Sequence, residues 1–282
     1  MRHDPLNSDP FPIDKQFPAE LVPFTFFSHG KRLLGRILVA QGAGPHPTIL
    51  LLHGFPGDEQ HGDLAHVFRR AGWNVMTFHY RGAWGSAGSF SFAHAFEDVP
   101  VALAFLRSPE IITQCRIDLE NVVLIGHSMG GFAALFTAAN DASIRAVASL
   151  AGFHFGIFAQ ILREQPELIA STAQEWESSL PALHAASAEQ LVQEVLTYEE
   201  QWNLYHYLNR LAERPMLLIG GSRDEIAPLD IHHTPLISAF QQTSTTRVQS
   251  VILPSDHAFS DARIAVAKHI LSWLDELKQK CA

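Results

Sequence analysis

Ser128 lies at the centre of residues 126–130, GHSMG, a Gly-x-Ser-x-Gly spacing that can make a serine hydroxyl into a nucleophile. Four branched apolar residues, 122–125, precede it and are typical of a strand buried on both faces. Residues 132–139 follow with a helical pattern. The serine is therefore predicted on a sharp strand-to-helix turn, where glycines remove side chains that would collide. A glycine-rich turn with an incidental serine is the alternative, which the surrounding sequence must decide.

A serine hydroxyl needs a general base within hydrogen-bond reach, and a third group must hold that base in the correct tautomer. The chain contains 16 histidines, so position rather than number selects the base. His257 follows the predicted strand 248–253, and Asp224 follows the predicted strand 215–219. Because the carboxyl ends of parallel strands meet at one edge of a sheet, we expect Ser128, Asp224 and His257 to meet there as nucleophile, orienting acid and base.

Three other acidic residues compete with Asp224 for the acidic position. Neighbouring side chains in an extended or turning chain point in different directions, so at most one of Asp224 and Glu225 is expected to face the imidazole. Asp230 is also nearby in sequence, whereas Asp256 is expected to cap the turn before the last helix. His127 is interpreted as structural, because a residue beside the nucleophile must aim away from it.

Attack on an acyl carbon creates an oxyanion that needs two preorganised hydrogen-bond donors. The amide of Met129 is expected to be one, because it begins a helix and gains from the helix dipole. The other is expected in residues 53–57, HGFPG, after the predicted strand 48–52. Pro56 has no N–H, so the amide of Phe55 is the expected second donor. A plain turn is the alternative interpretation of this loop.

Other candidate sites are weaker. His61, Asp63 and His66 could be metal ligands, but they lack a fourth partner at a recognised spacing, and the chain has no HExxH or CxxC motif. Residues 81–88, RGAWGSAG, are rich in glycine but lack the lysine of a phosphate-binding loop. We therefore expect no metal and no cofactor, and a structured loop on which Trp84 contacts the substrate.

The chain around these residues alternates between strand and helix patterns after an initial hairpin. Expected strands are 21–28, 33–40, 48–52, 74–80, 122–125, 146–151, 215–219 and 248–253, and expected helices are 63–71, 92–107, 130–139, 229–240 and 260–279. Repeated β-α units after an antiparallel start predict an α/β fold whose mostly parallel central sheet carries helices on both faces. Pro100 either starts the helix in which it falls or kinks it.

Residues 153–212 interrupt this alternation with about 60 residues of helical pattern, which is too long for an ordinary connection. The segment is rich in aromatic residues, and Phe153 and Phe155 are the candidates for substrate contact. We expect a helical cap, or lid, over the site; a helical excursion that merely packs on the sheet is the alternative. The expected organisation is a loosely held N-terminal arm (1–20), a core (21–152 and 213–282) and this cap (153–212).

Composition narrows the class of protein. The formal net charge is −9, and no cluster of lysine and arginine is present, which argues against nucleic acid as a partner. No run of 18 apolar residues is long enough to span a membrane, and residues 1–18 lack the apolar centre of a signal peptide. A cytoplasmic location is therefore the default expectation. Cys115 and Cys281 are expected to be free thiols without a role. Composition does not set an oligomeric state.

Four motifs then acquire a joint meaning: LLHGFPG, GHSMGG, GSRDEIAP and SDHAFS occur in this order. The sequence resembles the α/β-hydrolase superfamily over residues 21–282, in which nucleophile, acid and histidine follow one another along the chain. The resemblance favours Asp224, within GSRDEIAP, as the acid. The HYRGAWGSAG and DHAFSD stretches are similar to esterases and serine peptidases of the dienelactone-hydrolase and prolyl-oligopeptidase-like branches.

The resemblance implies a serine hydrolase that acts on a small-molecule acyl substrate through an acyl-enzyme. Carboxylic esters are favoured, because a peptidase needs a groove and terminus recognition that the sequence does not display. A peptidase of the acylaminoacyl type and a thioesterase are the alternatives within this chemistry. A ligand-binding protein that keeps the fold without catalysis is the alternative from a different class; the complete Ser-Asp-His set argues against it.

Overall fold

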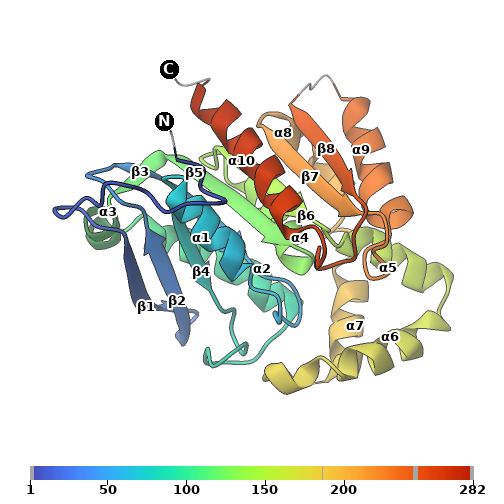
Figure 1. The fold of residues 1–282 in the computed structure, drawn as a ribbon. Coiled ribbons are helices and arrows are strands. Elements are labelled where there is room, and N and C mark those ends of the chain that lie inside the picture. Colours follow the sequence, from blue (N-terminus) through green and yellow to red (C-terminus); the bar gives the residue numbers. More distant parts are fainter. Residues whose placement is uncertain (1–2, 186, 244–246, 280–282) are drawn as a thin grey trace.

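One mixed sheet organises the chain, as the computed structural model in Figure 1 shows; it describes residues 3–185, 187–243 and 247–279. The strands are β1 (Glu20–Ser28), β2 (Lys31–Val39), β3 (His46–Leu52), β4 (Asn74–Phe78), β5 (Ile117–His127), β6 (Ala146–Leu150), β7 (Met216–Gly221) and β8 (Val248–Leu253). Their order across the sheet is β1-β2-β4-β3-β5-β6-β7-β8. β2 runs antiparallel to β1 and β4, whereas β4, β3, β5, β6, β7 and β8 are mutually parallel.

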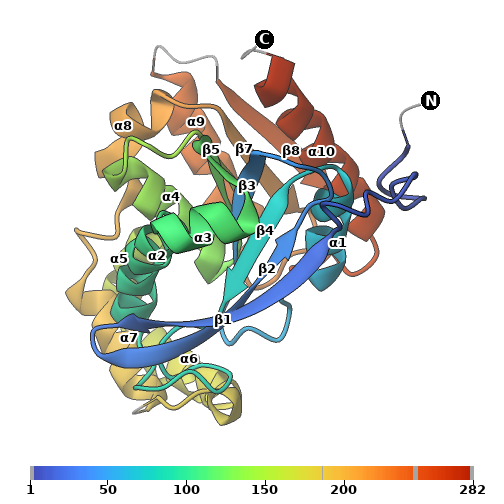
Figure 2. The ribbon, with the colours of Figure 1, turned by 90° about the vertical axis from the view of Figure 1, so that its left-hand side faces the viewer.

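Helices cover both faces of this sheet. They are α1 (Gly62–Arg70), α2 (Phe92–Leu106), α3 (Pro109–Cys115), α4 (Met129–Asn140), α5 (Phe155–Glu164), α6 (Leu168–Glu177), α7 (Ala188–Thr197), α8 (Leu208–Ala212), α9 (Thr234–Gln241) and α10 (Arg263–Gln279), with short turns η1 (Leu180–Ala182), η2 (Leu204–Tyr207) and η3 (Leu229–His233). Figure 2 shows α1 and α10 on one side of the strands and α2 and α4 on the other. Each layer buries its own apolar cluster against the sheet, which confirms the expected α/β architecture.

The structure differs from several local expectations and decides one alternative. The N-terminal arm is not loosely held, because Arg70 Nε donates to the Pro5 carbonyl at 2.7 Å and Gly42 N–H donates to the Phe17 carbonyl at 2.9 Å. α2 passes through Pro100 without starting there. The last helix begins at Arg263 rather than at residue 260. α3 was not expected at all. Cys281 lies outside the described residues, and Cys115 is buried at the end of α3 with a free thiol.

Residues 153–212 form the helices α5 to α8, and Figure 1 shows α6 and α7 set apart from the sheet. Hydrogen bonds attach this segment to the core. The Glu194 carboxylate accepts the N–H groups of Phe92 and Ala93 at 2.8 and 3.2 Å, so it caps the start of α2. His184 also pairs through its backbone with Gly82 and Phe90, at 2.6 and 2.8 Å. The segment is therefore tied to the loop that precedes α2.

Candidate active site

Ser128 occupies the turn between β5 and α4 in a backbone conformation that few L-residues adopt, with φ 54° and ψ −121°. The close approach of strand and helix explains the glycines. A Cβ atom on Gly126 would lie 1.9 Å from the Gly130 carbonyl oxygen, and one on Gly130 would lie 2.3 Å from the Leu52 carbonyl oxygen. Both positions therefore require glycine. The strained turn is of the type that holds a functional side chain at a strand end.

His257 and Asp224 come together at the ends of β8 and β7. His257 Nδ1 donates to Asp224 Oδ2 at 2.8 Å, and Asp224 Oδ1 accepts the N–H groups of Ile226 and Ala227 at 2.9 and 2.8 Å. These bonds fill both carboxylate oxygens and leave Nε2 of the imidazole as its acceptor nitrogen. Glu225 is exposed and does not take this place.

The remaining acidic candidates point elsewhere. Asp256 Oδ1 accepts the Ser260 N–H at 2.8 Å, which confirms that it caps the turn before the last helix. Asp230 is exposed at the start of η3. Of the four carboxylates considered, Asp224 is the one that the structure pairs with His257.

Burial shapes the charge of the Asp224 carboxylate, whose side chain is fully buried. Burial by itself raises its pKa, but the hydrogen bond and charge of His257, together with the two backbone amides, bring the pKa below its ordinary value of 3.8. Because the folded pKa is the lower one, ionised Asp224 stabilises the fold above about pH 4. This stabilisation is lost as the pH falls through the folded pKa.

A second histidine, His127, contacts His257, the candidate base. His127 Nε2 donates to the backbone carbonyl of His257 at 2.8 Å, and the two rings lie 4.7 Å apart. Burial, followed by the charge of His257, lowers the pKa of His127 to about 3, so the ring is a neutral donor at neutral pH. His127 is thus structural, as expected, and it links the nucleophile turn directly to the loop of the base.

Arg263 holds the next residue of the same loop. It donates to the Ala258 carbonyl at 2.9 Å and to His61 Nδ1 at 3.1 Å, and it forms two hydrogen bonds with Asp63. His61 in turn lies edge-on to His127, with ring centroids 4.7 Å apart. Two of the three residues considered as metal ligands therefore contact a guanidinium. Local sequence patterns carried no signal for these contacts, because Arg263 is about 200 residues away from His61 and Asp63.

Loss of the His127 hydrogen bond should displace His257, the candidate base, while its imidazole remains present. We expect His127→Ala to lower kcat for a p-nitrophenyl ester by about 10- to 100-fold with little change in KM, because small misplacements of a catalytic group cost this much. His127→Gln retains an N–H donor and should recover a large part of the loss. Steady-state kinetics on both variants provide the measurement. Equal kcat for the wild type and His127→Ala would show that the bond does not position the base.

The loop expected to supply an oxyanion donor lies against the nucleophile. A Cβ atom on Gly54 would approach the Ser128 Cβ to 3.0 Å, so the backbone before Phe55 is adjacent to the serine. The buried Tyr80 hydroxyl donates to the His53 carbonyl at 3.1 Å and anchors the start of the loop. Met129 is the first residue of α4, so its amide has no partner within the helix. Sequence reasoning did not identify the role of Tyr80.

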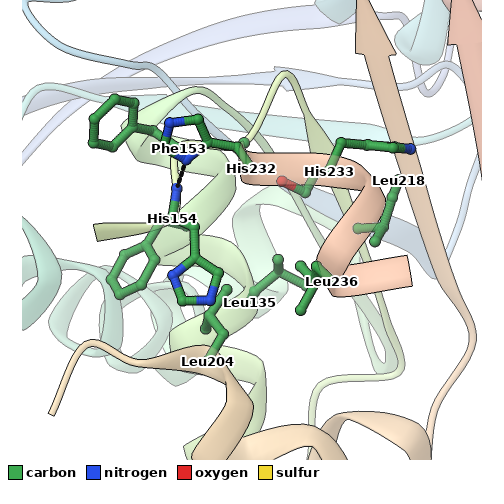
Figure 3. A pocket seen from close by; sticks show the side chains of 11 residues that line it. Leu135, Phe153, His154, Leu204, Leu218, His232, His233 and Leu236 are labelled. Carbon is green, nitrogen blue, oxygen red and sulfur yellow. Dashed lines mark hydrogen bonds between the residues drawn. The ribbon is translucent and has the colours of Figure 1, made fainter. Parts of the chain in front are cut away.

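Trp84 and the cap aromatics occupy different environments. Trp84 Nε1 donates to the Pro56 carbonyl at 2.9 Å, which places the half-exposed indole over the HGFPG loop. Phe153 lines a cavity shown in Figure 3 and stacks on His232 with ring centroids 4.5 Å apart. Phe155 is 2% exposed and packs among Phe92, Phe96, Phe132 and Trp202. The structure thus puts Phe155 in the core and Phe153 on the cavity wall.

In the part of the chain that the structure describes, every helix is too short or too polar to span a bilayer.

Two proteins are similar in sequence. Protein bem46 of Schizosaccharomyces pombe is 26% identical over 77% of this chain and 65% of its own length. An uncharacterized 31.7 kDa protein of Escherichia coli, from the traX-finO intergenic region, is 32% identical over 42% of this chain and 41% of its own length. The chain therefore spans less than two thirds of either relative.

Solved structures share the fold at low sequence identity. A 2,6-dihydroxy-pseudo-oxynicotine hydrolase superposes with a TM-score of 0.68 at 19% identity, over 93% of this chain and 68% of that one. Est1E from Butyrivibrio proteoclasticus gives 0.65 at 14%, over 92% and 99%. Acylaminoacyl peptidase from Pyrococcus horikoshii gives 0.67 at 16%, over 91% and 41%. The Alpha/beta hydrolase family profile matches residues 49–268. With this match and the fold in place, the chain belongs to the alpha/beta hydrolase family.

Proposed function

We propose that this chain is a serine hydrolase that cleaves small carboxylic esters through an acyl-enzyme. The observation that carries the proposal is the 2.8 Å hydrogen bond from His257 Nδ1 to the buried Asp224 carboxylate. It joins a base to an orienting acid at the sheet edge where Ser128 has its strained conformation. Nucleophilic acyl transfer accounts for all three features together.

In the proposed reaction the Ser128 oxygen attacks the acyl carbon while His257 Nε2 takes the hydroxyl proton. The ester oxygen then leaves as an alcohol and receives that proton from the imidazolium. Ionised Asp224 stabilises the imidazolium, and its hydrogen bond keeps Nε2 directed to the reaction. In the second half of the reaction a water molecule attacks the acyl carbon while His257 takes its proton. The Ser128 oxygen then leaves with that proton, which releases the carboxylic acid and regenerates the serine.

The amides of Phe55 and Met129 are proposed as donors to the oxyanion that forms in both halves of the reaction. Gly54 lies against Ser128, and Tyr80 and Trp84 hold the loop that contains Phe55. A rigid loop suits this role, because donors fixed before the reaction need no reorganisation when charge develops. The negative charge is then shared by two backbone dipoles, one of them at a helix N-terminus.

Residues 153–212 are proposed to form a wall of the acyl pocket. The hydrogen bonds of Glu194 and His184 to the core favour a fixed cap over a freely swinging lid. A fixed cap would bound the space for the acyl group and shield the reacting groups from bulk solvent, while still admitting the water molecule that hydrolyses the acyl-enzyme. The preference for an ester over a peptide bond rests on the sequence, in which no motif for recognising a peptide terminus was identified.

An activity-based probe and a substrate panel test the proposal. A fluorophosphonate should label Ser128 in the wild type, and labelling should disappear in Ser128→Ala. Hydrolysis of p-nitrophenyl esters of increasing chain length should exceed hydrolysis of aminoacyl-p-nitroanilides. Preference for the anilides would favour a peptidase. Preference for thioesters, assayed in the same panel, would favour a thioesterase. Absence of both labelling and turnover would favour a ligand-binding protein.

Two cap aromatics make a matched pair for testing the pocket. We expect Phe153→Ala to change the relative kcat/KM among ester chain lengths by about 10- to 200-fold, because its backbone N–H bonds the Ser128 carbonyl at 3.2 Å, which places this residue beside the acyl site. Phe155→Ala should instead lower the melting temperature, since truncating a buried ring costs about 3–5 kcal/mol. It should change the chain-length profile less than Phe153→Ala does, because its ring is buried behind Phe153, with ring centroids 5.1 Å apart. Thermal melts and kinetics on both variants supply the comparison. An unchanged profile in Phe153→Ala would remove the ring from the substrate pocket.

A further inference from the structure

A small cavity lies beneath the carboxyl ends of β6 and β7, between α4 and the beginning of the cap. Its volume is about 20 Å³, which is enough for one water-sized group. Four leucines form part of its wall: Leu135 from α4, Leu204 from η2, Leu218 from β7 and Leu236 from α9. Figure 3 shows the His154 imidazole beside Leu135 and Leu204. Six apolar residues therefore share the wall with three histidines, one serine and one glycine, so the cavity is of mixed polarity.

The His154 ring contributes one defined hydrogen-bond donor. Its Nδ1 accepts the N–H of Ile157 at 3.3 Å and caps α5, so the ring proton resides on Nε2. Burial, followed by the charge of His232, lowers the pKa of His154 to about 3, and the ring is neutral at neutral pH. The residue is 2% exposed, and Nε2 has no hydrogen-bond partner among the described residues. A buried N–H without a partner is costly, which makes this atom a candidate for ligand binding.

The cavity is next to the candidate nucleophile. Phe153, on the cavity wall, donates its backbone N–H to the Ser128 carbonyl at 3.2 Å. Its ring stacks on His232, whose Nδ1 accepts the His154 backbone N–H at 2.9 Å, as the dashed line in Figure 3 marks. His232 is close enough to Asp224 for the carboxylate charge to affect its pKa. The stacked rings of Phe153 and His232 thus line the cavity and lie close to the candidate catalytic residues.

The chemistry of the wall restricts what can bind. No lysine, arginine, aspartate or glutamate lines the cavity, so a charged group would be buried there without a partner. A neutral N–H donor requires an acceptor, and the volume admits one water-sized group. A carbonyl oxygen that branches from a chain meets both requirements, because the chain itself can remain outside the cavity.

We propose that His154 Nε2 donates a hydrogen bond to a ketone oxygen on the acyl chain of the substrate, so that the cavity selects oxo-acyl esters over plain acyl esters. The inference rests on the proposed ester hydrolysis and names its substrate class. A plain chain would leave the N–H unpaired, whereas an oxo chain pairs it. A neutral hydrogen bond of this kind corresponds to a preference of about 10-fold in kcat/KM.

The test compares p-nitrophenyl esters in pairs of equal chain length, with and without a ketone, and moves the ketone along the chain from the third to the sixth carbon. The readout is the ratio of kcat/KM for the oxo ester to that for the plain ester. For the wild type we expect a ratio of about 10 at the ketone position that reaches the cavity. Ratios near one at every position would overturn the proposal.

Two histidine variants make the comparison specific. His154→Asn keeps an oxygen that can cap α5, since asparagine is a favoured N-cap residue, but its shorter side chain withdraws the donor from the cavity. Its ratio should fall to about one. His233→Asn is the matched control, because His233 also lines the cavity but directs Nε2 to Ser250 Oγ at 2.9 Å. Its ratio should remain that of the wild type. A ratio of 10 that persists in His154→Asn would show that another group recognises the ketone.

Binding to Ser128→Ala separates this proposal from the proposed function. Isothermal titration calorimetry of this variant with the same ester pairs measures affinity without turnover. The oxo ester should bind about 10-fold more tightly, and His154→Asn in the same background should abolish the difference. If the wild type hydrolyses no ester, the proposed function fails, yet the calorimetric ratio still decides the subsite. Equal affinities for the two esters would refute the subsite even when hydrolysis is observed.

Discussion

Ser128→Ala is expected to lower kcat for p-nitrophenyl acetate by about 10⁴- to 10⁶-fold. The reason is that removal of the hydroxyl leaves His257 without a group to activate, while the amides of Phe55 and Met129 remain. Loss of one member of a catalytic triad removes nearly the whole contribution of the unit. Steady-state kinetics give the measurement, and fluorophosphonate labelling of the variant sets an upper limit on contaminating wild-type enzyme. Retention of a tenth of the wild-type activity would show that this serine is not the nucleophile.

A glycine at the same position provides the matched control for folding. Ser128 has φ 54°, a conformation that strains a residue with a Cβ atom by about 1–3 kcal/mol and costs glycine little. Ser128→Gly should therefore be as inactive as Ser128→Ala but melt at a higher temperature. Loss of activity with retained or raised stability separates a chemical defect from a folding defect. A lower melting temperature in the glycine variant would argue against strain at this turn.

Asp224→Asn is expected to lower kcat by about 10⁴-fold. Because the amides of Ile226 and Ala227 hold the side-chain oxygen, the asparagine NH2 faces His257 Nδ1 and donates to it. The ring proton is then on Nε2, so the imidazole cannot accept the serine proton there. The change preserves size and shape, and the backbone bonds from Ile226 and Ala227 can still reach the side-chain oxygen. Steady-state kinetics across pH measure the effect. Stability should fall less than activity.

Two neighbouring carboxylates serve as controls for Asp224→Asn. Glu225→Gln alters an exposed side chain, and Asp256→Asn alters the cap of the Ser260 turn. Each should reduce kcat by less than about 10-fold, because neither contacts the imidazole nitrogen that Asp224 holds. Comparable losses in all three variants would mean that net negative charge, rather than one oriented carboxylate, supports the reaction.

The sequence by itself determined most of the succession of strands and helices, though not α3, and the loops that carry Ser128, Asp224 and His257. These features depend on local patterns. Branched apolar runs predict buried strands, and the glycines around Ser128 predict a turn in which side chains would collide. The fold class was confirmed for the same reason, since repeated β-α units allow few arrangements of a sheet. Element ends were missed by a few residues, because long-range contacts decide where a helix stops.

Only the tertiary structure decided the direction of individual side chains. Asp224 and Glu225 are adjacent in sequence, and the 33-residue separation from His257 gives no local signal for which of them turns inward. The hydrogen bond of His127 spans 130 residues, and the N-terminal arm is held by Arg70, 65 residues away from Pro5. Phe155 was a candidate for substrate contact because it is an aromatic residue of the cap, yet four rings from elements distant in sequence enclose it. Packing selects these contacts because burial and hydrogen bonding depend on neighbours in space, which local periodicity does not specify.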